Sequence, residues 1–241
     1  PDLMAVIAIG DFDPKYVESL VKKFFNKVKA KNKRPLPDTT IPKYQKTIYV
    51  AQKDSEQTST VINILNKNLK LKSDTARNAR ELNIRRFCIQ IFKQRLDSIL
   101  LDRKSALFKG YIGTFNLTLN NEFYYIIAQL NEDEIKEGIN ILFTEIERVK
   151  QNGFTLKELE IEKEKEILFY EQAIKAKKTR STDSIVAEYT RNFLENEYVI
   201  GIEDEYKLIK QLLPTISVSD LNKHFLNWFK LDDRIINIQY P

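Results

Sequence analysis

The feature that most constrains this chain is an unbroken apolar run near its start. Residues 3–9 read Leu-Met-Ala-Val-Ile-Ala-Ile, and Gly-Asp-Phe-Asp-Pro comes next at 10–14. Such a run, ended by glycine and proline, is typical of a strand buried on both faces. Asp13 is placed to cap a helix, and apolar residues at spacings of three and four predict that helix over 15–29. Because a buried strand needs neighbours on both sides, we expect the rest of its sheet to lie elsewhere.

A charged, proline-containing segment separates this strand and helix from the rest of the chain. Residues 30–42 read AKNKRPLPDTTIP, with three prolines and no apolar period. Prolines remove backbone donors and disfavour helix, so the segment is expected to be a linker. We therefore divide the chain into a strand and helix that end a preceding domain (1–30), a linker (31–45) and a second domain (46–241).

The second domain is expected to be α+β, with a mostly antiparallel sheet and helices packed on one face. Partial alternation of apolar and polar residues predicts strands over 46–51, 59–65, 107–119, 122–130 and 234–240. Helical periodicity predicts helices over 75–101, 131–151, 155–178, 182–195, 203–213 and 217–229. Thr155 and Glu158 form a capping box, and Leu156 is expected on the buried side of its helix. Cys88 falls within an apolar stripe, so an inert core thiol is expected.

The composition is that of a globular protein with a mild positive charge. Hydrophobic residues make up 42% of the chain, enough for a packed core, and no apolar run approaches the roughly 20 residues that span a bilayer. We find no signal-peptide pattern. Lysine and arginine number 39 against 34 aspartates and glutamates, with both signs interspersed. That balance favours a solvated surface over a nucleic-acid footprint.

One basic cluster leaves an alternative open. Over the helix at 75–101 and its exit, cations outnumber acids: Arg85, Arg86, Lys93, Arg95, Arg103, Lys104 and Lys109 against Asp97 and Asp102. Such a cluster could bind an anion or a nucleic acid. The favoured interpretation is that it balances acids on a neighbouring element.

The motifs of a catalytic or metal site are missing from this sequence. His224 is the single histidine and Cys88 the single cysteine, so a four-ligand zinc site would depend on carboxylates. Neither His-x-x-Glu-His nor His-Glu-x-x-His occurs, and there is no glycine-rich phosphate loop and no Gly-x-Ser-x-Gly elbow. His224 is expected to be a satisfied, partly buried or surface residue. We predict no catalytic residue and no metal ligand in this chain.

Four segments, in order along the chain, resemble the insulinase/pitrilysin-type zinc peptidases. Residues 1–25 are similar to the strand and helix that close the catalytic domain of that family. Residues 94–113, 153–159 and 213–221 are similar to signatures of the next, non-catalytic domain, and the 94–113 segment looks closest to the large bacterial members. The resemblance implies that 46–241 is a non-catalytic domain of the insulinase-type peptidase fold and that 1–30 ends the catalytic domain.

The resemblance also implies where the chemistry lies. In that family zinc is held by two histidines of His-x-x-Glu-His and a more distant glutamate, all upstream of the Gly-Asp strand. Zinc is thus expected in an upstream catalytic domain of a zinc metallopeptidase, and this chain alone would be inactive. It would hold that domain as its partner and help to enclose a peptide substrate. In some members an arginine and a tyrosine contact the substrate. Tyr111 matches that tyrosine and Arg103 or Lys104 falls near the arginine, with simple packing of Tyr111 in the sheet as the alternative.

Other interpretations stay open. The chain could be a stand-alone interaction module of the same fold without metal, or, less favoured, an anion or nucleic-acid binder that uses residues 85–109. No membrane span and no nucleic-acid partner are expected, and a homo-oligomer is left open. Bacterial members are often exported, so the resemblance points to the cell envelope or periplasm.

Overall fold

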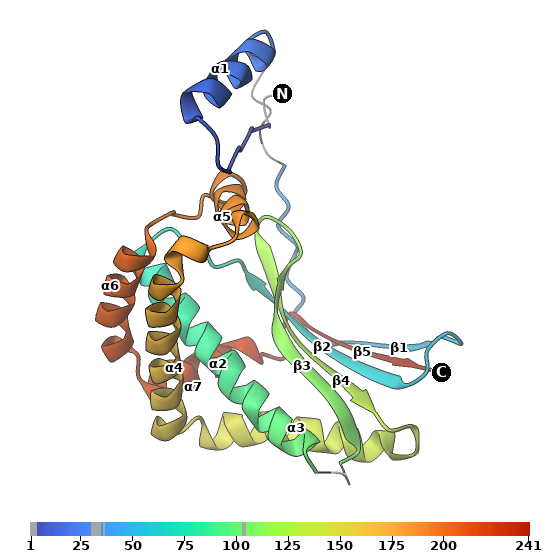
Figure 1. Cartoon of the computed structure of the whole chain (residues 1–241). Coiled ribbons are helices and arrows are strands. Elements are labelled where there is room, and N and C mark those ends of the chain that lie inside the picture. The colour runs from blue at the N-terminus through green and yellow to red at the C-terminus, as the bar shows by residue number, and fades with distance from the viewer. Residues whose placement is uncertain (1–3, 30–34, 36, 103–104) are drawn as a thin grey trace.

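A computed structural model describes residues 4–29, 35, 37–102 and 105–241. Within them lies one five-stranded sheet in the order β1-β5-β2-β4-β3 (Figure 1). The strands are β1 (Ile48–Lys53), β2 (Thr60–Leu69), β3 (Leu107–Asn116), β4 (Asn121–Leu130) and β5 (Arg234–Tyr240). β1 and β5 run parallel, and every other pair is antiparallel. The predicted, mostly antiparallel sheet is confirmed.

Helices cover one face of this sheet, which confirms the α+β class (Figure 1). They are α2 (Ala76–Leu100), α3 (Ile135–Asn152), α4 (Leu156–Lys175), α5 (Thr182–Glu195), α6 (Ile202–Leu212) and α7 (Val218–Trp228), with 3₁₀ turns at Glu132–Glu134, Lys177–Thr179 and Leu213–Thr215. The long helix α2 lies nearest the sheet, and its predicted apolar stripe is buried, with Ile84, Phe87 and Phe92 each at most 1% exposed. The stripe joins sheet and helices into one core.

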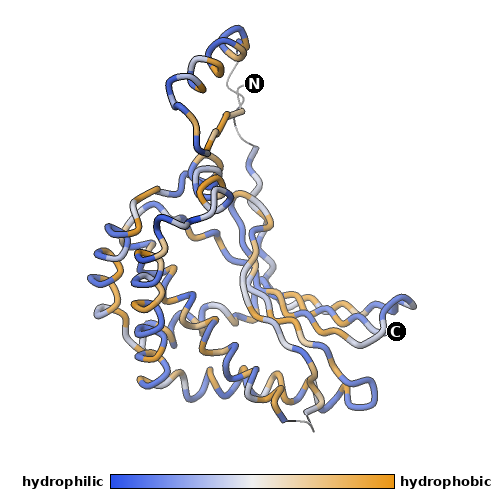
Figure 2. Tube along the Cα trace, viewed as in Figure 1, coloured by the Kyte–Doolittle hydropathy of each residue, from blue (hydrophilic) through white to orange (hydrophobic). Residues whose placement is uncertain are grey.

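The other face of the sheet carries no helix of the described chain. Apolar and polar residues alternate along the strands (Figure 2). In β2, Ile62 and Ile64 are buried against the helices, whereas Leu65 points the other way and is only partly buried. We call this second side the helix-free face. By register it joins Leu65, Tyr125, Ile127, Ile235, Tyr111 and Phe115.

Residues 4–29 stand apart from this domain (Figure 1). The predicted helix is confirmed as α1 (Pro14–Phe25), with Asp13 accepting from the Lys15 N–H at 2.9 Å. Its apolar side is formed, but α1 buries no residue and Phe24 is 66% exposed. The strand predicted over 3–9 is not formed here, since the described residues 4–9 belong to no strand. The sheet of this chain offers them no partner, and a lone strand is not stable in water.

Three local details test the sequence predictions. The capping box is confirmed, because the Thr155 hydroxyl accepts from the Glu158 N–H at 3.2 Å and Glu158 accepts from the Thr155 N–H at 2.7 Å. Leu156, predicted to be buried, is 64% exposed, because it lies at the first position of α4, at the margin of the buried side that Leu159, Glu162 and Tyr170 form. Cys88 is fully buried, and burial raises the pKa of its thiol well above the usual value, as expected of an inert core thiol.

Candidate functional site

The second half of the predicted linker is held against the helix-free face by one lysine. Lys67 in β2 has a side chain that is 3% exposed, and its Nζ lies 2.9 Å from Asp233 Oδ1. The same ammonium donates to the carbonyl oxygen of Ile41 at 3.1 Å and to that of Pro42. It also lies 4.3 Å from the centre of the Tyr44 ring. Residues 37–44, which we call the strap, are therefore fixed to the sheet.

Backbone hydrogen bonds complete this attachment. The Tyr44 N–H donates to Asp233 Oδ1 at 2.7 Å, and the Asp233 N–H donates back to the Tyr44 carbonyl at 3.0 Å. Asp233 adopts the left-handed conformation, with φ of 54°, that turns its side chain and N–H toward the strap. Further along, the Ile41 N–H donates to Asn121 Oδ1 at 2.7 Å. The strap thus has a defined path over the ends of β2 and β4.

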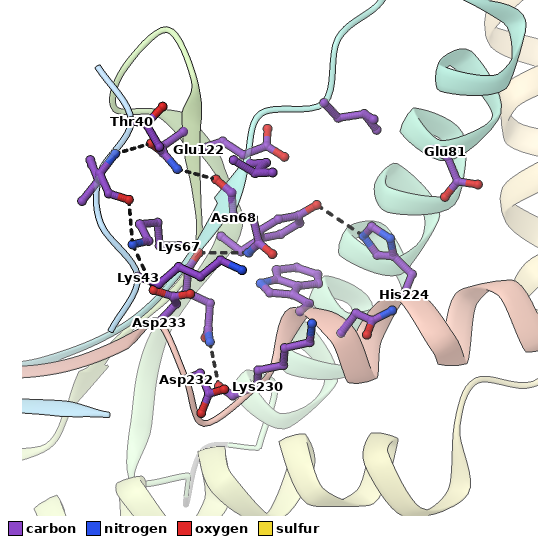
Figure 3. Close-up of a pocket in the computed structure, with 18 residues that line it drawn as sticks. Thr40, Lys43, Lys67, Asn68, Glu81, Glu122, His224, Lys230, Asp232 and Asp233 are labelled. Carbon is purple, nitrogen blue, oxygen red and sulfur yellow. Dashed lines mark hydrogen bonds and ion pairs between the residues drawn. The ribbon is translucent and has the colours of Figure 1, made fainter. Parts of the chain in front are cut away.

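A cavity of about 430 Å³ lies between the strap, the ends of β2 and β4, and α7 (Figure 3). Its lining includes Lys43 of the strap, Tyr124, and Trp228 and His224 of α7. The Tyr124 hydroxyl lies 3.4 Å from His224 Nε2, and the Tyr124 and Trp228 ring centres are 4.4 Å apart. The cavity is therefore partly aromatic and partly polar.

Several charges around this cavity are held in structural contacts. Burial, with a smaller contribution from the positive Arg85, lowers the pKa of His224 to about 4, so the ring is neutral at pH 7. Glu122 forms an ion pair with Arg85 at 2.6 Å, and Asp233 forms one with Lys67 at 2.9 Å. No group of three or more histidine, cysteine, aspartate or glutamate residues able to hold a metal occurs among the described residues. These contacts join β2, β4 and α2 to the neighbouring segments.

The basic cluster is largely paired with acids. Arg85 pairs with Glu122, and Arg86 pairs with Glu166. Lys93 pairs with Asp97 at 2.6 Å. Arg95 contacts Glu158 at 2.8 Å and Glu145 at 3.6 Å. The acids come mainly from β4, α3 and α4, so the described part of this cluster balances neighbouring elements, in agreement with the favoured interpretation.

Of the three predicted substrate-contacting residues, only Tyr111 lies in the part of the chain that the structure describes. Tyr111 lies on β3, an edge strand, and points to the helix-free face opposite Ile127. It is 51% exposed, so it is not a core residue. Arg103 and Lys104 lie outside the described residues, and their relation to Tyr111 stays a prediction.

The described residues form an α+β domain, with helices on one face of a five-stranded sheet. A protein-family model described as "Peptidase M16 inactive domain" matches residues 1–166. The chain therefore belongs to the peptidase M16 inactive-domain family. This confirms the resemblance and the non-catalytic assignment drawn from the sequence.

Relatives with similar sequences are named as zinc proteases. The chain is 25% identical over 223 residues to "Zinc protease PQQL-like" of Arabidopsis thaliana, a match that covers 92% of the chain and 20% of that relative. It is 25% identical over 256 residues to "Probable zinc protease PqqL" of Haemophilus influenzae, a match that covers 100% of the chain and 26% of that relative. The chain thus spans about a quarter of the length of these relatives or less.

Solved structures share the fold. The periplasmic protease PqqL from Escherichia coli superposes with a TM-score of 0.85 at 19% identity, covering 95% of this chain and 26% of that one. The first half of the same protease gives a TM-score of 0.86, covering 96% of this chain and 50% of that one. The chain therefore matches about half of the solved first half of that protease. No helix in the described parts of our chain is long and apolar enough to cross a membrane.

Proposed function

We propose that this chain is the non-catalytic domain that holds a preceding zinc-peptidase domain in place and helps to enclose its peptide substrate. One observation carries the proposal: α1, which has an apolar side but buries no residue, precedes a strap that is tied down by Lys67. The family model matches these N-terminal residues together with the domain as far as residue 166. Such an arrangement is what a connection between two packed domains requires.

We assign a role to each part of the chain on the basis of this arrangement. Residues 1–30 complete the preceding catalytic domain, 31–45 connect, and 46–241 form the non-catalytic domain. Zinc and its ligands belong to the preceding domain, because relatives are named zinc proteases and the described residues hold no metal-binding cluster. The E. coli relative is periplasmic, which supports the cell envelope as the compartment. No observation favours the nucleic-acid alternative, since most described cations of the basic cluster are paired.

Tyr111 is the residue we propose for substrate contact. Half of its side chain is exposed on the helix-free face at the edge of the sheet, where an enclosed peptide could reach it. We expect Tyr111→Ala, in the polypeptide that carries the preceding domain, to lower kcat/KM for peptides roughly tenfold, which corresponds to about 1.4 kcal/mol.

The matched control is Tyr49→Ala, since Tyr49 is 72% exposed on the opposite edge strand and faces the other side of the sheet. The control should change kcat/KM by less than about twofold, and both variants should retain the zinc content and unfolding midpoint of the parent. Equal effects of the two substitutions would refute the substrate-contacting role of Tyr111.

A further inference from the structure

Helix α5 has an apolar side that the described domain does not bury. Ile185, Tyr189 and Phe193 recur every fourth residue, so they lie on one side of the helix. Yet α5 buries no residue: Tyr189 is 46% exposed and Phe193 49%, and the adjacent Leu194 is 62% exposed. An amphipathic helix normally buries its apolar side. A contiguous exposed group of this kind marks an interaction surface.

This helix is fixed in place despite its exposure. The Ser181 hydroxyl caps its start by accepting from the Ser184 N–H at 3.3 Å. At its end, Glu195 pairs with Lys70 at 2.6 Å, and the Tyr198 N–H donates to the Ser73 carbonyl at 3.1 Å. The fold therefore sets the direction in which the apolar side of α5 points.

A series of contacts places α5 beside the point where the strap begins. Asn120 Nδ2 donates to the Thr40 hydroxyl of the strap at 3.1 Å. The Asn120 carbonyl accepts from the Lys70 N–H at 2.9 Å, and the Lys70 ammonium holds Glu195 of α5. In Figure 1, α5 lies at the same end of the molecule as α1. The described start of the strap therefore lies next to the end of α5.

We infer that the apolar side of α5 is the docking surface for the preceding domain of the same polypeptide, an inference that rests on the proposed function. The stretch from 30 to 36 spans at most about 25 Å when extended, so whatever α1 belongs to stays within reach of α5. A short tether of this kind raises the effective concentration of the tethered domain to the millimolar range. Since the chain covers 26% of the E. coli protease PqqL, a relative of this size has ample further chain to supply that domain.

The test uses the polypeptide that carries the preceding domain, with a protease site inserted between residues 30 and 36. After cleavage, the dissociation constant of the two pieces is measured. Phe193→Glu places a charge on the apolar side of α5. Ala187→Glu places the same charge on the exposed side of the helix, about opposite Tyr189, and serves as the control. Because Phe193 is half exposed, both variants of this chain should unfold at the parental midpoint.

We expect Phe193→Glu to weaken the association at least tenfold and Ala187→Glu to change it less than twofold. If the two variants weaken association equally, the α5 surface is wrong while the proposed function stands. If the parental pieces separate freely after cleavage, the proposed function itself fails. If this chain alone forms a dimer that Phe193→Glu abolishes, a second copy covers α5 and the inference is overturned.

Discussion

His224 shows how one residue can be important to a fold without being catalytic. Its ring packs against Tyr124 and Trp228 from the side of α7, and burial keeps it neutral with a pKa of about 4. The positive Arg85, which pairs with Glu122, adds to the effect of burial. Protonating His224 therefore opposes folding.

This arrangement predicts a pH dependence of stability. An unfolded histidine titrates near pH 6.5, so as pH falls from about 6.5 toward 4 the unfolded state takes up a proton that the folded state resists. The contribution of neutral His224 to the free energy of unfolding is thus complete above about pH 6.5 and is lost as the pH falls to about 4. By pH 4.5 the loss should be roughly 2 to 3 kcal/mol. Urea unfolding at pH 7.5 and 4.5 measures it.

The comparison is made with His224→Gln, which has no titrating group. The variant should lack this part of the pH dependence, although it is less stable than the parent at pH 7.5 because the glutamine disturbs the aromatic packing. Parallel pH profiles for parent and variant would show that His224 is not held neutral by the fold.

At the scale of elements, the strap matters because it fixes the connection to the preceding domain against the sheet. Lys67 is nearly inaccessible and satisfies the Ile41 and Pro42 carbonyls and Asp233 together. We expect Lys67→Met, which keeps the apolar stem, to cost about 3 kcal/mol, because Asp233 loses its charged partner in a partly buried site. Trypsin should also cut faster after Lys43 in the strap.

Lys53→Met provides the control, since Lys53 is exposed at the end of β1. It should change the free energy of unfolding by less than about 0.5 kcal/mol and leave trypsin cleavage after Lys43 unaltered. A loss below about 1 kcal/mol in Lys67→Met, with an unchanged cleavage rate after Lys43, would show that the lysine does not hold the strap.

Most elements could be predicted from the sequence because their periodicity is local. The bounds of α5 and β5 agree with the prediction, and the Thr155 capping box lies where the motif places it. The strand over 3–9 is absent because strand formation depends on partners that this sheet does not supply. The insertion of β5 between β1 and β2 could not be predicted, since that pairing joins the two ends of the domain.

The strap attachment could not be predicted either, for the same reason. Lys67 and Asp233 meet only because β2 and β5 pair, and no local pattern links them. A weak signal was present, however: Lys67 lies on the same side of β2 as Val61 and Leu65, which are apolar, although Asn63 on that side is polar. A charged residue at such a position indicates a buried partner. For Cys88, in contrast, helical periodicity alone was enough to predict a buried thiol.

At the scale of the whole molecule, we interpret this chain as a supporting domain, with catalysis assigned to the preceding domain. The domain has a continuous core, paired charges and, in its described part, no metal-binding cluster. The unburied apolar side of α5 lies at the same end of the molecule as α1, which also buries no residue (Figure 1). We interpret that end as the side that faces the preceding domain.

The most direct test measures metal content together with peptidase activity. This chain is assayed alone, and again after addition of a purified segment that carries the preceding domain. We predict that the chain alone is free of stoichiometric zinc and cleaves no peptide, and that full activity appears only when both pieces are present. Stoichiometric zinc and peptide cleavage by this chain alone would contradict the assignment of catalysis to the preceding domain.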